Sequence, residues 1–136
     1  MRVVKPRNRD EAIIQEHVVK LLKAYGRHDI EWHCVPNGAV LPWKVAKELR
    51  AMGVIPGVGD IMLLIDAASH ALELKTEAGE QSADQEAWQE QHERAGGYYH
   101  LAFGLDEAIG ILMAINAFRP NIQIQSSKPV RTLAPA

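Results

Sequence analysis

Two short apolar runs in the middle of the chain constrain its fold more than any other feature. Ile61–Ile65 is apolar throughout, and the largely apolar His70–Lys75 follows after only four residues, Asp66–Ser69. Short apolar runs bounded by turn-forming residues are typical of strands with both faces buried. The short separation favours an antiparallel hairpin. We therefore expect these two strands at the centre of a sheet.

Helical patterns flank this hairpin. Apolar residues recur at helical spacing from about residue 10 to 25, a basic helix is expected over 44–52, and another helix runs from Ser82 to about Gly96. Asp106 can cap a last helix that Pro120 breaks. Further strands are expected over 31–35 and 98–103. This order predicts an α/β domain in which helices flank a small mixed central sheet.

The length and composition fit one compact soluble domain. The chain has 136 residues, and we expect the domain to span 1–118, followed by a mobile tail over 119–136 that is rich in Ser, Pro and Ala. Cys34 is the only cysteine, so no intramolecular disulfide can form, and we expect a cytoplasmic location. No apolar run approaches the roughly 20 residues that a membrane helix needs.

Charge is unevenly distributed along the chain, whose formal net charge is -2. Residues 1–27 carry seven bases against three acids, and residues 44–50 carry three bases against Glu48. Residues 77–93 hold six acids and no Lys or Arg. The basic segments could bind a phosphate backbone, or they could be ordinary solvated helix surfaces.

The candidate chemistry lies around the central hairpin. Gly57-Val-Gly-Asp60 puts a carboxylate at the start of one strand, and Glu73-Leu-Lys75 puts an acid and a base on one face of the next. If the strands pair, Asp60 lies beside Glu73. Two carboxylates this close repel unless a cation lies between them, and Mg2+ prefers such oxygen ligands. The alternative is an exposed ion pair on a strand, worth about 0 to 1 kcal/mol.

In its ordered combination of motifs the chain resembles a VRR-NUC domain, a branch of the PD-(D/E)XK nucleases with a restriction-endonuclease-like fold. The resemblance spans residues 10 to about 118 and rests on the following residues: Glu11, Gln15, Asn37-Gly38, Gly53, Gly57 to Asp60, Glu73 to Lys75, Gly79, Ser82 to Gln85 and Gly96 to Tyr98. Two positions depart from the family pattern. Gly59 stands where proline is usual, and Leu41 stands where arginine is frequent, although Lys44 could substitute for that arginine.

The resemblance implies a divalent-metal-dependent DNA endonuclease. The family occurs as stand-alone phage proteins and as the catalytic part of a DNA-repair enzyme. By this resemblance Asp60 and Glu73 hold Mg2+ or Mn2+ with the Leu74 carbonyl, and Lys75 is the catalytic lysine. An acid on the first helix and Gln85 complete the site.

Helical phase selects that acid. Glu11 lies at the border of the apolar stripe, where it can reach the sheet and become a further metal ligand, whereas Glu16 faces solvent. Glu11 could instead only stabilise the helix N-terminus. Gln85 has a competing role as well, because Ser82-x-x-Gln85 is a capping box. We expect both Glu11 and Gln85 to belong to the site.

The expected partners are DNA and a second copy of the chain. Nucleic-acid-binding candidates are Asn37, Lys44, Lys47 and Arg50. A homodimer would offer two centres to branched DNA, and the apolar residues of the last helix, Ile111, Leu112, Ile115 and Phe118, could extend into that partner or be buried within the monomer. The alternative function is a nucleic-acid-binding module that keeps the nuclease fold without turnover.

Overall fold

A computed structural model describes residues 9–36, 41–122 and 124 of the chain. This part contains four helices and four strands, as the sequence predicts for an α/β domain with a mixed sheet. In chain order the elements are α1 (Arg9–Tyr25), β1 (Glu31–Cys34), α2 (Trp43–Ala51), β2 (Ile61–Ile65), β3 (Ala68–Lys75), α3 (Ala83–Arg94), β4 (Tyr98–Phe103) and α4 (Leu105–Ala114).

The four strands form one sheet in the order β1-β2-β3-β4. β1, β2 and β3 pair antiparallel, whereas β3 and β4 pair parallel. Two parallel strands cannot be joined by a tight turn, so the chain crosses over between them, and α3 forms that crossover. The central hairpin predicted from the two apolar runs is therefore present, with β3 between an antiparallel and a parallel neighbour.

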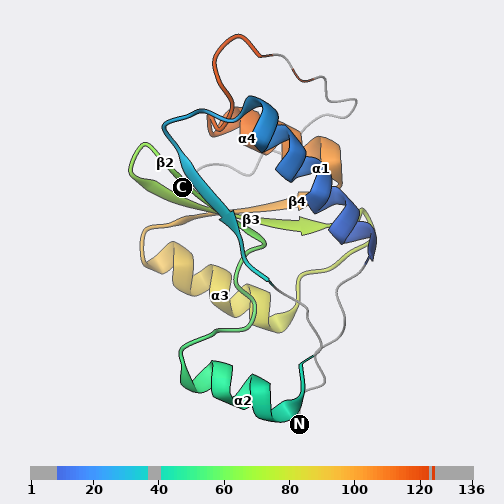
Figure 1. The fold of residues 1–136 in the computed structure, drawn as a ribbon, viewed down its shortest axis with the longest axis vertical. Coiled ribbons are helices and arrows are strands. Elements are labelled where there is room, and N and C mark those ends of the chain that lie inside the picture. The colour runs from blue at the N-terminus through green and yellow to red at the C-terminus, as the bar shows by residue number, and fades with distance from the viewer. Residues whose placement is uncertain (1–8, 37–40, 123, 125–136) are drawn as a thin grey trace.

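The helices cover the sheet unequally. α1 and α4 lie against one face, α3 lies on the other, and α2 lies farther out beyond α3 (Figure 1). The main core cluster joins the sheet to α1 and α4 through residues such as Val18, Leu22, Leu72 and Leu112. Neither α2 nor α3 contains a buried residue. The apolar core of the described residues thus lies on the α1/α4 face.

The hairpin turn is shorter than the sequence suggested. β3 begins at Ala68, so only Asp66 and Ala67 connect the strands, with φ of 50° and 65°. Positive φ at both residues is the twist that two-residue hairpins favour, although Gly is the usual second residue. The Arg27 guanidinium donates to both carboxylate oxygens of Asp66, at 3.0 and 3.2 Å, and so fixes the turn.

The last helix also differs from expectation at both ends. Gly104, with φ of 89°, is its N-cap, so Asp106 lies inside the helix. The helix ends at Ala114, and Asn116 adopts a φ of 61° beyond it. Phe118 therefore lies outside the helix, in a bridge to Gly26. Pro120 does not end the helix, because the left-handed turn ends it earlier.

The start of the expected tail is attached to α1. The Arg119 backbone N–H donates to the Tyr25 carbonyl at 2.9 Å, and its guanidinium donates to the Ala24 carbonyl at 2.8 Å. Residues 123 and 125–136 lie outside the described residues, so the predicted mobility of the tail stays a prediction there.

The apolar residues that were expected on the last helix are used within the monomer. Ile111, Leu112 and Phe118 are 5%, 0% and 7% exposed, and Ile115 packs against the same cluster. The face suggested for a partner is therefore covered by the chain itself, as the simpler alternative predicted. No helix among the described residues is long and apolar enough to cross a membrane.

Candidate active site

A glycine-rich loop delivers Asp60 to the edge of α3. Gly57 has a φ of 85°, and a Cβ added to it would lie 2.3 Å from the Asp84 carbonyl oxygen. A Cβ on Gly59 would lie 3.1 Å from the Ala71 Cβ. The loop can therefore approach both α3 and β3 closely because these positions lack side chains. Gly59, which stands where the family usually has proline, thus lies where the loop approaches β3.

Asp60 is held at the start of β2 and is only 4% exposed. Its carboxylate oxygen Oδ2 accepts a hydrogen bond from the Leu74 backbone N–H at 2.8 Å. Its backbone carbonyl accepts one from the Val35 N–H at 2.9 Å. Leu74 thus contacts the site through its N–H, and the expected role of its carbonyl as a metal ligand stays a prediction.

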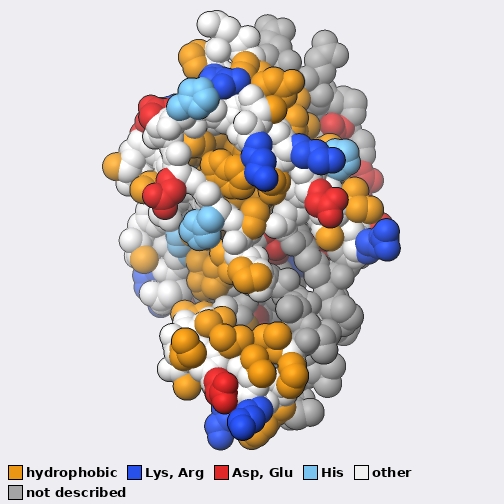
Figure 2. Space-filling view, in the orientation of Figure 1, with side chains coloured by type: hydrophobic (Ala, Val, Ile, Leu, Met, Phe, Trp, Pro, Cys, Tyr) orange, Lys and Arg blue, Asp and Glu red, His pale blue; other side chains and the backbone are white. Residues whose placement is uncertain are grey.

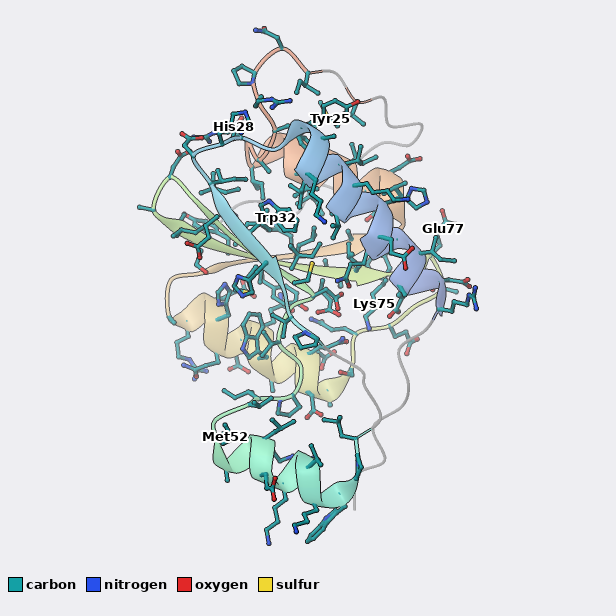
Figure 3. All side chains as sticks on the ribbon, viewed as in Figure 1. Tyr25, His28, Trp32, Met52, Lys75 and Glu77 are labelled. Atoms are coloured by element: carbon teal, nitrogen blue, oxygen red, sulfur yellow. The ribbon has the colours of Figure 1, made fainter. Side chains whose placement is uncertain are left out.

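Glu73 and Lys75 lie on one face of β3, because strand residues two apart point the same way. Ile61 pairs with Leu72, so continuing the register by one residue places Asp60 opposite Glu73. Glu73 is 2% exposed and Lys75 is 7% exposed. Burial to this extent excludes the alternative of an exposed ion pair. Figure 3 places Lys75 at the end of β3.

Gln85 makes the capping-box hydrogen bond and also contacts Glu73, two contacts that were expected to compete. Its Oε1 accepts from the Ser82 backbone N–H at 2.8 Å, which completes the capping box of α3. Its Nε2 donates to Glu73 Oε1 at 2.7 Å. The expectation of competition was wrong because the amide has separate acceptor and donor ends. One side chain therefore fixes the helix start and orients a buried carboxylate.

The site holds more negative charge than its surroundings can solvate. Burial raises the pKa of Glu73 well above its usual range, and the nearby Asp60 carboxylate raises it further. The second carboxylate oxygen of Glu73, Oε2, is buried and has no hydrogen-bond partner among the described residues. A buried acceptor without a partner is costly, and a bound cation would satisfy it.

The structure brings Glu11 to this site and keeps Glu16 away. Glu11 is half-buried in the first turn of α1, and its charge is among those that raise the pKa of Glu73. Glu16 is exposed. The two acids thus lie on the sides of α1 that the helical phase predicted, although Ile13, which was placed in the apolar stripe, is 44% exposed. The catalytic role of Glu11 stays a prediction.

The carboxylates suit an ion that keeps several water ligands. Among residues 9–36, 41–122 and 124, no three His, Cys, Asp or Glu side chains gather into a complete metal-binding group. Asp60 and Glu73 would thus supply two ligands, with Glu11 farther away. Mg2+ is often bound through one or two carboxylates and retained waters, so these residues fit it.

The expected nucleic-acid-binding residues divide into two groups. Lys44, Lys47 and Arg50 are exposed on α2. Asn37 lies outside the described residues. Leu41, where the family frequently has arginine, is 41% exposed and lies just before α2.

A hydrogen-bonded group beside the site was missed by the sequence analysis. Tyr99 is 8% exposed on the α3 side of β4, where its ring packs against Trp88. Gln81 Nε2 donates to the Tyr99 hydroxyl at 3.1 Å and to Gln89 Oε1 at 2.7 Å. Burial raises the pKa of Tyr99, and the charge of Glu73 raises it further, so this hydroxyl lies near the site. Alternation along β4 was a usable signal, but the parallel register that aligns Tyr99 with Ala71 was not known from sequence.

Comparison with known proteins identifies a solved structure with a similar fold. No profile of a known protein family matches the chain, and no curated protein matches it by sequence. A solved structure described as a VRR_NUC domain protein is similar, with a TM-score of 0.65 and 21% identity. The similarity covers 80% of this chain and 89% of that one. The chain therefore shares the fold of a VRR-NUC domain, as the motif resemblance implied.

Proposed function

We propose that the chain is a divalent-metal-dependent DNA endonuclease that hydrolyses phosphodiester bonds. The observation that carries this proposal is the buried Glu73 carboxylate, which lies beside Asp60 and has one oxygen without a partner among the described residues. Two buried carboxylates this close are costly when both are ionised, unless a cation lies near them. Lys75 and Gln85 beside it supply the charge and orientation that a phosphodiesterase site needs.

In this proposal Asp60, Glu73 and the Leu74 carbonyl hold Mg2+ or Mn2+, with Glu11 as a further candidate ligand. The bound ion lowers the pKa of water and offsets the charge of the phosphoryl group. Because Gln85 donates to Glu73 Oε1, Oε2 would be the oxygen available to hold the ion. The Leu74 N–H holds Asp60 in the same way through Oδ2.

Lys75 orients the attacking water and offsets the negative charge that grows on the phosphate. The water oxygen forms a bond to phosphorus while the bond from phosphorus to the 3′ oxygen breaks. The attacking water gives up one proton to solvent, and the leaving 3′ oxygen takes one up from solvent, so the products carry a 3′ hydroxyl and a 5′ phosphate. The ammonium of Lys75 stabilises the transition state more than the substrate, because charge increases between them.

Branched DNA is the proposed substrate. The exposed bases of α2 would hold the backbone, whereas the acidic surface of α3, with Asp84, Glu86 and Glu90, would repel it. A two-fold substrate such as a four-way junction suits a homodimer, because two centres can then make paired cuts. Light scattering at several protein concentrations tests the dimer, and a monomer at tens of micromolar that leaves four-way junctions intact would contradict it.

The experiment that tests the function is cleavage of a labelled panel of duplex, flap, splayed-arm and four-way DNA. We expect cleavage with Mg2+ and none with EDTA, most strongly on branched substrates. The Lys75→Ala variant is the matched control for a contaminating nuclease. Binding of the same DNA without metal-dependent cleavage would instead support the alternative, a nucleic-acid-binding module that keeps the fold without turnover.

A further inference from the structure

α2 is the helix whose stability is least accounted for by packing against the rest of the domain. It has nine residues and none is buried, although isolated helices of this length are marginal in water. Apolar and basic side chains gather over it at the lower end of the molecule (Figure 2). Trp43 and Met52 at its two ends are 61% and 80% exposed.

The side chains of α2 are sorted around the helix. Trp43, Lys47 and Arg50 are four and three residues apart, which places them on one stripe, and all three are exposed. The Lys47 ammonium lies 5.2 Å from the centre of the Trp43 ring. Ala46, which is half-buried, borders this stripe, and the half-buried Leu49 lies farther round the helix. The stripe of Trp43, Lys47 and Arg50 is thus an aromatic ring followed by two cations, facing solvent.

We propose that this stripe binds unpaired nucleotides, with Trp43 stacking on a base and Lys47 and Arg50 contacting the neighbouring phosphates. The inference rests on the proposed function in taking DNA as the ligand, and it specifies which part of a branched substrate the domain recognises.

The positive charge of α2 favours nucleic acid over a second copy of the chain as the partner that binds this stripe. α2 carries Lys44, Lys47 and Arg50 against Glu48, so it attracts phosphate. If the stripe packed on its own copy across a two-fold axis, the cations of both copies would face each other. Like charges that face each other across an interface disfavour that arrangement.

Stacking decides between unpaired and paired DNA. Both faces of a base inside a duplex are covered by neighbouring bases, so an aromatic side chain reaches only unpaired or terminal ones. Proteins that bind single strands combine a positive groove with such aromatic platforms. The stripe spans about 10 Å along the helix axis. Flaps and splayed arms offer unpaired segments of at least this length.

The helix that carries the stripe is joined to the candidate active site by a short loop. The loop that follows α2 leads directly to Asp60, and its Gly57 contacts Asp84 in the first turn of α3. The same turn of α3 contributes Gln85 to the candidate active site. Nucleotides held on α2 are therefore bound to an element tethered directly to the metal-binding loop.

The test measures DNA affinity of the full chain in EDTA, so that binding is read independently of cleavage. We expect Trp43→Ala to weaken binding of a single-stranded oligothymidylate and of splayed-arm DNA about tenfold, and of blunt duplex less than twofold. Trp43→Phe should keep most of the affinity because it keeps a ring. Met52→Ala is the matched control, since Met52 is more exposed and lies off the stripe.

Fluorescence gives a second measurement. Trp32 and Trp88 are half-buried, so the exposed Trp43 should dominate quenching by the oligonucleotide. We expect Trp43→Phe to lose this quenching while retaining binding. Circular dichroism checks that each variant keeps the fold.

Three outcomes would overturn the inference. The first is unchanged single-strand affinity in Trp43→Ala, and the second is an equal loss for duplex and single strand. The third is conversion of a dimer into a monomer with DNA affinity unchanged, which would assign the stripe to a second copy. Cleavage of the DNA panel is scored separately: Trp43-dependent binding without metal-dependent cleavage would remove the proposed function and leave this inference standing.

Discussion

The two faces of the sheet differ in what they bury. On the α1/α4 face, Leu72, Leu74 and Ala102 are fully buried among apolar neighbours from the helices. On the α3 face, Glu73 and Lys75 are nearly as buried, but their neighbours are charged or polar groups such as Gln85. One face therefore holds the apolar core, and the other holds the candidate site.

β3 belongs to both faces because its side chains alternate. Leu72 and Leu74 point into the core, whereas Glu73 and Lys75 between and after them point to the site. One strand therefore carries both the core face and the candidate site. Variants on the two faces should consequently separate stability from activity.

The largest expected effect is on activity at the α3 face. We expect Asp60→Asn and Lys75→Ala each to reduce cleavage at least a hundredfold, since a lost electrostatic group typically costs about 10² to 10³ in rate. DNA affinity should change little. Cleavage of a labelled flap with Mg2+ measures the first effect and binding in EDTA measures the second. Normal turnover by either variant would contradict the assignment of the site.

The next effect is on stability and contrasts the core with α2. We expect Leu112→Ala, in the fully buried core of the α1/α4 face, to lower the free energy of unfolding by about 2 to 5 kcal/mol. Leu49→Ala on α2 removes the same atoms from a half-buried position outside that core and should cost less than about 1 kcal/mol. Urea unfolding measures both, and equal losses would show that α2 is part of the cooperative core.

A smaller effect tests whether the buried Glu73 carboxylate lowers the free energy of unfolding. Since the pKa of Glu73 is raised in the folded protein, folding favours its protonated form, and stability is lost as pH rises above the unfolded value. We expect Glu73→Gln to raise the free energy of unfolding by at least about 1.4 kcal/mol near pH 8 in EDTA, the value of one pKa unit. The gain should vanish near pH 4. Thermal unfolding at both pH values measures it, and a destabilised variant at pH 8 would contradict the buried-charge account.

The smallest expected effect compares two acids on α1. We expect Glu11→Gln to reduce cleavage about tenfold or more, as loss of a group near a metal site commonly does. Glu16→Gln should change it less than twofold because Glu16 is exposed. Parallel rate measurements decide, and equal losses would remove Glu11 from the site.

The sequence predicted the elements better than their ends. Tyr98–Phe103 was placed correctly because Gly97 and Gly104 bracket a short aromatic run. The turn at Asp66 was expected to be four residues long, since Ala67 has no local preference for the positive φ that it adopts. Gly104 rather than Asp106 caps α4, because the tight exit from β4 requires a φ of 89° there.

The site was predictable in composition but only partly in contacts. The pairing of Asp60 with Glu73 followed from alternation and a hairpin, which are local. The dual contacts of Gln85 depend on where α3 begins relative to β3, and the place of Tyr99 depends on the parallel register. Both are set by packing between distant segments, which no local pattern contains.

The two-residue turn at Asp66 and Ala67 has a consequence for how the sequence can change over time. Strand side chains alternate with a period of two, so one inserted residue that slips the register would turn Glu73 and Lys75 into the apolar core and expose Leu72 and Leu74 to the polar face. The turn is exposed, yet it should reject insertions of odd length. The loop before Asp60, bounded by Gly53 and Gly57, carries no such constraint at its α2 end, so length variation among descendants of this chain should accumulate there instead.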